Sequence, residues 1–261
     1  RVGKTYLVRE TFAGHFSFYH TGVANVGTSE QLLHFRDSLV RYGYEDCPPI
    51  SCWREAFLAL EHVVETSRDA HKVIFIDELP WLDTRMSKFV PALEHFWNAW
   101  ASARKDLTLI VCGSATSWMI SKVIKNHGGL HNRVTDRIHL QPFSLGECEQ
   151  YAASLGLEFN REDICRTYMA LGGIPFYWDM LKRGKSVAQN MDAMFFAEGG
   201  KLRGEFDELF QSLFKQSKMH RNLVEALAKR GIGMTRDDLL KALKVSDGGK
   251  ITTCLEELQQ C

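Results

Sequence analysis

Arg1-Val2-Gly3-Lys4-Thr5 is the stretch of sequence that decides the fold. It matches the last five positions of the phosphate-binding pattern G-x-x-x-x-G-K-[ST], so we expect the first glycine of that pattern and the strand before it to lie upstream of residue 1. Gly3 has no side chain to keep backbone N–H groups away from phosphate oxygens. We expect Lys4 to reach the β- and γ-phosphates and Thr5 to ligate Mg²⁺ at the start of a helix, whose amino end attracts anions. A solvated lysine in a turn is the alternative for so short a match.

A second motif favours the nucleotide site over that alternative. Val73-Ile74-Phe75-Ile76 is a continuous apolar run, typical of a strand buried on both faces in a parallel sheet covered by helices. The strand ends in Asp77, which we expect to hold the Mg²⁺ hydration shell, and Glu78, which we expect to polarise the water that attacks the γ-phosphate. A surface acid pair that closes a strand is the alternative. It does not explain why the pair follows G-K-T at about the distance that a β-α-β-α unit occupies.

Apolar periodicity predicts further helices and strands around this run. We expect helices over 5–12, 29–42, from Ser51 onward and over 87–103, and strands over 16–19 and 107–114. Leu7, Val8 and Phe12 should pack inward from the first helix, and Ser51 should cap the third. The run from 107 to 112 predicts a second strand that is buried on both faces.

Two polar residues beyond this second strand are further candidates for the site. Ser114 ends the strand, where it would touch the γ-phosphate or the attacking water, or would simply cap the next helix; the sequence leaves both open. Arg133 lies in a glycine-bearing loop, and its guanidinium suits bidentate contact with phosphate charge. It is a candidate finger or intramolecular sensor, with a surface salt bridge as the alternative.

The composition of the chain limits the classes of protein to which it could belong. The chain has 261 residues, enough for two or three units with a large core, and its 45% hydrophobic content is that of a globular protein. Lysine plus arginine (32) equals aspartate plus glutamate (32), so no global basic field indicates nucleic acid or an acidic membrane. The seven cysteines form no C-x-x-C pair, which favours a reducing, cytoplasmic setting. The longest apolar runs are too short for a membrane span.

The second half of the sequence predicts helices. We expect them over 145–155 and 161–171, followed by Gly172-Gly173-Ile174-Pro175, where two glycines allow close backbone approach and the proline fixes the exit direction. An ordinary helix end is the alternative for that stretch. Helices over 201–214, 221–229, 235–243 and 249–260 follow, and the last three suggest a helix-turn-helix that stops where a wing would begin.

These segments together resemble a known family. R-V-G-K-T, V-I-F-I-D-E-L-P-W-L, L-I-V-C-G-S, N-R before R-I-H-L-Q-P-F-S-L, and G-G-I-P-F-Y resemble, in that order, the archaeal and bacterial ATPases of the AAA+/STAND group of P-loop NTPases. The resemblance implies an α/β fold: a parallel sheet of ASCE type flanked by helices, then an α-helical lid and a partial winged helix. It divides the chain into an ATPase core (1–141) without its first strand, a helical lid (142–200) and a partial winged helix-turn-helix (201–261).

The resemblance also implies roles for individual residues. Gly3, Lys4 and Thr5 would end Walker A, Asp77 and Glu78 would be the metal-binding and catalytic acids of Walker B, and Ser114 would be sensor 1. Arg133 would be the arginine of the family's G-R loop, although that loop here reads Asn132-Arg133. Pro175 would be the lid proline that leans on the base. The candidate residues are therefore catalytic Glu78, Arg133 and Ser114, nucleotide-binding Val2, Gly3, Lys4, Thr5, Tyr6, Asp77 and Pro175, and magnesium-binding Thr5 and Asp77.

We therefore expect a P-loop ATPase that binds ATP and Mg²⁺. It would hydrolyse ATP to ADP and phosphate, and couple this reaction to movement of its C-terminal winged helix. We expect the 261-residue chain to be a fragment, and assign turnover to the full-length protein. A DNA-binding regulator and a nucleotide-gated scaffold with little turnover are the alternatives. The last helix offers only Lys250 against Glu256 and Glu257, so DNA and a protein partner both stay open for the tail.

Overall fold

A computed structural model describes residues 2–113, 116–124, 129–130, 133–214 and 217–259. The chain divides into two compact units, Gly3–Leu140 and a second that contains Gln141–Cys261. The boundary between the two units lies between residues 140 and 141. No helix in the described ranges is long and apolar enough to cross a bilayer.

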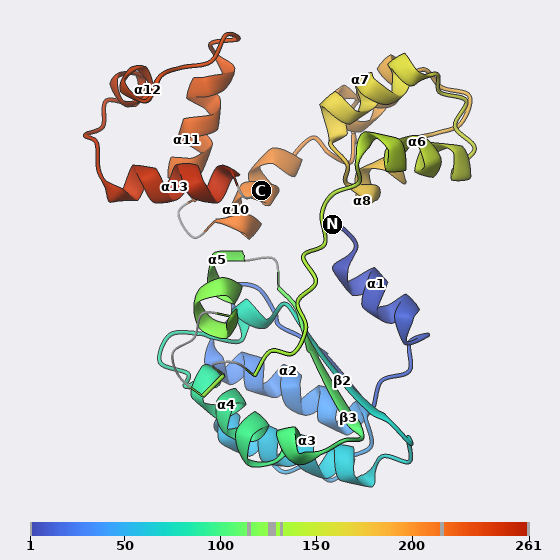
Figure 1. The fold of residues 1–261 in the computed structure, drawn as a ribbon, viewed down its shortest axis with the longest axis vertical. Coiled ribbons are helices and arrows are strands. Elements are labelled where there is room, and N and C mark those ends of the chain that lie inside the picture. Colours follow the sequence, from blue (N-terminus) through green and yellow to red (C-terminus); the bar gives the residue numbers. More distant parts are fainter. Residues whose placement is uncertain (1, 114–115, 125–128, 131–132, 215–216, 260–261) are drawn as a thin grey trace. The chain divides into compact units, whose positions relative to one another are not determined.

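The first unit is built on a parallel sheet of three strands in the order β1-β2-β3 (Figure 1). The strands are β1 (Phe18–Thr21), β2 (Lys72–Asp77) and β3 (Leu107–Val111). Phe18 pairs with Ile74, and Ile74 pairs with Leu109. β2 lies in the middle, and its residues 73–77 are buried, as the continuous apolar run predicted. β3 is only half-buried along its length, so the prediction that it is buried on both faces is wrong.

Helices surround this sheet. They are α1 (Lys4–Thr11), α2 (Thr28–Arg41), α3 (Trp53–Thr66), α4 (Phe89–Ala99) and α5 (Thr116–Met119), with a π-helical turn at Ile120–Ile124 and 3₁₀ turns at Leu79–Trp81 and Ala101–Ala103. The apolar stripe of α3 is buried, and its Trp53 and Phe57 rings both contact Phe35 of α2. Apart from α1, these helices form one core with the sheet.

Three local predictions for this unit are wrong in detail. The first strand begins at Phe18, two residues later than expected, although the Ser17 N–H already donates to Val73 O. No residue of α1 is buried, and Leu7 is 41% exposed. Ser51 does not cap α3; its hydroxyl and backbone N–H both donate to Glu55.

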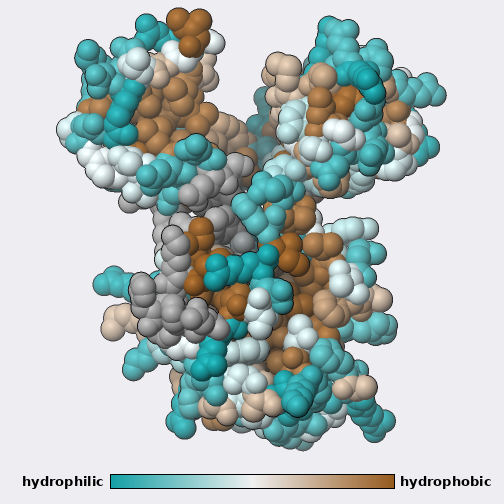
Figure 2. Space-filling model, viewed as in Figure 1, coloured by the Kyte–Doolittle hydropathy of each residue, from teal (hydrophilic) through white to brown (hydrophobic). Residues whose placement is uncertain are grey.

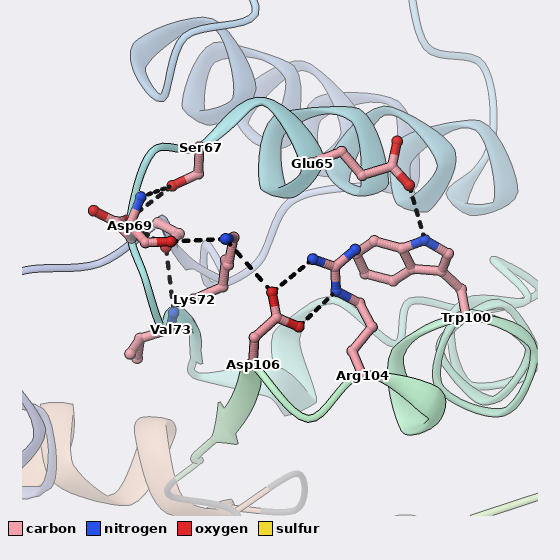
Figure 3. Close-up of polar contacts among 9 residues, drawn as sticks. Glu65, Ser67, Asp69, Lys72, Val73, Trp100, Arg104 and Asp106 are labelled. Carbon is pink, nitrogen blue, oxygen red and sulfur yellow. Dashed lines mark hydrogen bonds and ion pairs between the residues drawn. The ribbon is translucent and has the colours of Figure 1, made fainter.

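A polar network fastens the amino-terminal ends of β2 and β3 (Figure 3). Asp106 accepts from Arg104 at 2.8 Å and lies 3.5 Å from the Lys72 ammonium. The Arg104 guanidinium also covers the ring of Trp100, whose indole N–H donates to Glu65 at 3.1 Å. Since these side chains hold one end of the sheet, the carboxyl-terminal edge is the end left for binding a ligand, as is usual in parallel α/β sheets.

The second unit is helical in its described part. Its elements are α6 (Leu145–Ser154), α7 (Arg161–Leu171), α8 (Pro175–Trp178), α9 (Val187–Met191), a π-helical turn (Asp192–Phe196), α10 (Glu205–Leu213), α11 (Ser217–Ala228), α12 (Arg236–Leu243) and α13 (Gly249–Gln259). α6, α7 and α9 each begin with a capping box. One core surrounds the buried Trp178, and a smaller one joins Leu223, Leu239 and Cys254 of the last three helices.

Candidate functional site at the carboxyl-terminal edge of the sheet

The carboxyl-terminal ends of three parallel strands lie at one edge of the sheet. Gly22 follows β1, Asp77 ends β2, and Cys112 follows β3. Backbone bonds join the three segments: the Gly22 N–H donates to Asp77 O at 2.9 Å, and the Cys112 N–H donates to Ile76 O at 3.1 Å. The edge is therefore a continuous backbone frame on which side chains can be fixed.

The start of α1 reaches this frame. The Thr5 hydroxyl donates to Asp77 Oδ2 at 2.5 Å, across 72 residues of sequence. The Lys4 ammonium donates to the carbonyl oxygen of Gly113 at 2.9 Å, across 109 residues. The structure thus brings the G-K-T stretch to the ends of β2 and β3, where the acidic pair lies.

Gly3 permits this placement through its backbone conformation. It is the N-cap of α1 with φ of 95°, in the left-handed region that favours glycine. A Cβ there would meet nothing within 4 Å, so the requirement for glycine comes from the dihedral angle alone. The turn at Gly3 sets the direction in which α1 starts and so carries Lys4 and Thr5 to the sheet.

Asp77 is buried, with 4% of its surface exposed, and both of its carboxylate oxygens have donors. Oδ2 accepts from Thr5, while Oδ1 accepts from the Glu78 N–H at 2.8 Å and from the Cys112 thiol at 2.6 Å. Burial, and then the negative charge of Asp77, raise the pKa of Cys112 well above its usual range. Cys112 therefore stays a protonated thiol that donates to Asp77 and fixes the direction of the carboxylate.

Glu78 follows Asp77 in an uncommon backbone conformation. Its φ of 48° is rare for a residue with a side chain, and it sits where the chain turns into the 3₁₀ helix Leu79–Trp81. Gly22 lies directly against it: a Cβ at Gly22 would be 2.6 Å from Glu78 O. Gly113 is equally close to Pro80, whose Cδ a Cβ would approach to 2.4 Å. Two glycines therefore allow the strand ends to close around the acidic pair.

The other predicted residues are not connected to this cluster by the described contacts. Val2 is half-buried before α1, and Tyr6 is 68% exposed on α1. Arg133 is exposed, and its backbone N–H donates to Leu130 O at 3.1 Å. Pro175 belongs to the second unit, at the first turn of α8. Ser114, predicted as sensor 1, lies outside the described residues, as does Asn132 of the N-R pair.

The donor set at Asp77 fits a magnesium ion. Mg²⁺ prefers hard oxygen ligands and keeps several of its waters, so it needs only one or two protein oxygens together with phosphate oxygens. The Thr5 hydroxyl and the Asp77 carboxylate supply such oxygens at one place. Lys4 brings a positive charge to the same edge through its bond to Gly113. The arrangement can hold a cation and the phosphate groups that bind with it.

Sequence reasoning missed three residues that shape this site. The sequence placed Cys112 at the end of the second apolar run, and it assigned no role to Gly22 or Gly113. A glycine near the carboxyl end of a predicted parallel strand is a usable signal for Gly22 and Gly113, because strand ends meet at one edge. No sequence signal distinguishes Cys112, since its role depends on the register that places it beside Asp77.

Comparison with known proteins agrees with this architecture. No protein-family model and no curated protein sequence matches the chain. Among solved structures, it is similar to the Walker-type ATPase PABY2304 of Pyrococcus abyssi, with a TM-score of 0.69 and 16% sequence identity over 99% of this chain and 81% of that one. At such identity the likeness concerns the fold and not the activity. The chain has the fold of a Walker-type ATPase, with a small parallel sheet flanked by helices.

Proposed function

We propose that this chain is a P-loop ATPase of the AAA+/STAND type, which binds Mg-ATP and couples its hydrolysis to movement of a C-terminal winged-helix region. The single observation that carries the proposal is the hydrogen bond of 2.5 Å between Thr5 Oγ1 and Asp77 Oδ2, with Lys4 bonded to Gly113 beside it. These are the side chains that two separate sequence motifs assign to one magnesium-triphosphate position. If these side chains had only a structural role, nothing would require Lys4, Thr5 and Asp77 to lie together.

Each side chain of the cluster has a task in phosphoryl transfer to water. Lys4 exchanges Gly113 O for the β- and γ-phosphate oxygens and offsets their negative charge. Thr5 and Asp77 hold Mg²⁺, which when bound neutralises charge on the phosphates. Glu78, held in its turn by the close contact with Gly22, orients the attacking water and accepts its proton. Two further residues stay proposed catalytic residues, Ser114 and Arg133. Three stay proposed nucleotide-binding residues: Val2, Tyr6 and Pro175.

The proposed role of the tail is docking rather than DNA reading. In α13 the Thr252 hydroxyl accepts from Arg236 at 2.8 Å, and Arg236 is itself paired with Asp247. Two polar side chains that could have faced DNA, Thr252 and Arg236, are therefore already bonded within the tail. Figure 2 shows hydrophobic residues on the visible face of these helices, in the upper left of the view, and Ile232 is 92% exposed. These features support a protein surface as the object that the tail contacts.

The test measures ATP binding by calorimetry and phosphate release, both with the full-length protein, to which turnover is assigned. Lys4→Ala should weaken binding by about 10- to 100-fold, the worth of hydrogen bonds to a charged group. Glu78→Gln should lower phosphate release by roughly 100-fold and leave ATP affinity unchanged. Exposed Lys105→Ala and Glu45→Gln serve as matched controls in the same unit.

The outcomes separate the candidate functions. Failure of the wild-type protein to bind Mg-ATP, or a Lys105→Ala effect equal to that of Lys4→Ala, contradicts the nucleotide site itself. Tight binding with no phosphate release in the wild type contradicts the ATPase and supports the alternative, a nucleotide-gated scaffold. A shift of duplex DNA that falls steeply with salt would favour the DNA-binding regulator over protein docking.

A further inference from the structure

Three potential metal ligands meet between two helices of the tail. His220 lies on α11, and Cys254 and Glu257 lie three residues apart on α13. Residues at i and i+3 share one face of a helix, so both side chains of α13 point to the same side. One ligand atom from each of the three residues lies within 4.8 Å of the other two. No sequence motif marks this cluster, because its members come from separate helices.

The cluster is largely shielded from water. The side chain of His220 is 1% exposed, Cys254 is 3% exposed, and the side chain of Glu257 is 32% exposed. His220 Nε2 lies 2.8 Å from Glu257 Oε2, and the ring of Phe214 stacks on the imidazole with centroids 3.9 Å apart. Glu257 thus connects an otherwise buried group of ligands to the surface, which provides a path of entry for an ion.

We propose that His220, Cys254 and Glu257 bind a divalent transition-metal ion, with Zn²⁺ as the best fit. Imidazole nitrogen, thiolate sulfur and carboxylate oxygen are the three ligand types that zinc uses in proteins. The sulfur ligand disfavours Mg²⁺ and Ca²⁺, which take oxygen ligands. Three protein ligands leave the fourth tetrahedral position to water or to another donor.

Charge balance supports an ion in this buried place. A neutral imidazole, a thiolate and a carboxylate carry two negative charges, which a divalent cation cancels, so the loaded cluster buries no net charge. On binding, Cys254 releases its thiol proton to solvent. His220 releases the Nε2 proton that it donates to Glu257 and takes up one on Nδ1, so the imidazole stays neutral while its Nε2 lone pair becomes available to the metal. No redox change occurs in this exchange.

A bound ion would connect α11 to α13 and so stabilise the folded tail. Metal binding to preformed ligands adds to folding free energy, because the unfolded chain does not hold the ligands together. The competing account is that His220 and Glu257 form a buried hydrogen bond for which no metal is required. The two accounts differ in whether the Cys254 sulfur contacts a cation.

Titration of the full metal-free chain with Co²⁺ in the presence of a reductant tests this proposal. Nucleotide is left out because triphosphates chelate metals, so the result is independent of the ATPase proposal. We expect tetrahedral cobalt absorption bands and a thiolate-to-cobalt charge-transfer band that saturate together, and we expect Zn²⁺ to displace Co²⁺. Cys254→Ser should lose the charge-transfer band, whereas Cys165→Ser, an exposed cysteine of the same unit, should keep it.

A second variant covers the case in which Cys254→Ser fails to fold. Glu257→Gln retains an amide oxygen for the hydrogen bond to His220 but loses the anionic ligand, and should weaken Zn²⁺ by at least about tenfold. Zn²⁺ should also raise the melting temperature of the wild type and of Cys165→Ser more than that of Glu257→Gln. Absence of a charge-transfer band in the wild type, or equal Zn²⁺ affinity and stabilisation in Glu257→Gln, overturns the proposal.

Discussion

Gly22→Ala is the substitution that most directly tests how the backbone positions Glu78. A Cβ at Gly22 would lie 2.6 Å from Glu78 O, 3.1 Å from Trp81 Cβ and 3.3 Å from Leu82 Cγ. Gly22 cannot simply move away, because its N–H is bonded to Asp77 O at 2.9 Å. Relief of the contact therefore separates the end of β1 from Asp77 and Glu78 by roughly 0.5 to 1 Å, the distance needed to restore an ordinary van der Waals contact.

The expected effect is on turnover and not on nucleotide affinity. A misplacement of about 1 Å at a reacting group can cost about 100-fold in rate, so we expect kcat for phosphate release to fall by roughly 10- to 100-fold. Lys4 and Thr5 are carried by α1 and do not touch Gly22 in the described contacts, so ATP affinity should stay within about threefold, less than the loss of one hydrogen bond.

The assay compares steady-state phosphate release and calorimetric ATP binding in Gly22→Ala and in Gly27→Ala. Gly27 is a matched control because a Cβ there meets nothing within 4 Å and its φ of −81° suits any residue. Circular dichroism confirms that both variants are folded, since overpacking costs roughly 1–3 kcal/mol of stability. Unchanged kcat in Gly22→Ala, or an equal loss in Gly27→Ala, refutes the reasoning.

Three further predictions concern other parts of the molecule. Cys112→Ala removes the thiol donor of Asp77 and should raise the Mg²⁺ concentration for half-maximal phosphate release by about tenfold; an unchanged magnesium titration contradicts this role. Burial, with the nearby His34 and Arg41, lowers the pKa of His20 to about 3. As pH falls below about 6.5, His20 therefore binds a proton in the unfolded chain but not in the folded chain. The stability of the first unit should therefore drop by about 2 kcal/mol from pH 7 to pH 5, as measured by urea unfolding. Tryptophan fluorescence is the probe because five of the six tryptophans precede residue 141, and His20→Leu should flatten the dependence whereas exposed His15→Gln should not. In the second unit, a Cβ at Gly173 would lie 1.9 Å from Phe143 O, so Gly173→Ala should lower stability by at least about 1–3 kcal/mol in thermal melts, whereas Gly146→Ala, with open space around it, should not.

The central strand could be predicted from sequence because its chemistry is local. An apolar run such as Val73–Ile76 fits a strand that is covered on both faces, and β2 is buried there. The run in β3 looks similar, but within the described sheet β3 pairs with β2 alone, which leaves it half-buried. Burial of a strand depends on which elements pack beside it, and these cannot be inferred from the strand's own residues.

The same contrast holds for the site. Lys4, Thr5 and Asp77 could be chosen from sequence because phosphate and magnesium chemistry restricts the residue types at fixed motif positions. Cys112 and Gly22 act through contacts between strands, so their roles follow from register and close approach. Leu7 was expected in the core, yet α1 buries no residue. An apolar side chain on a helix indicates a packing face only when a partner surface lies opposite.

The bond between Lys4 and the carbonyl of Gly113 has a consequence for signalling. A triphosphate that attracts the Lys4 ammonium leaves Gly113 O without that donor, and a backbone acceptor in a partly buried place must then find another. The segment that follows β3 would consequently register the arrival of the nucleotide before any bond to phosphorus is broken. Binding of the nucleotide and its hydrolysis would thus affect the rest of the chain as two separate events.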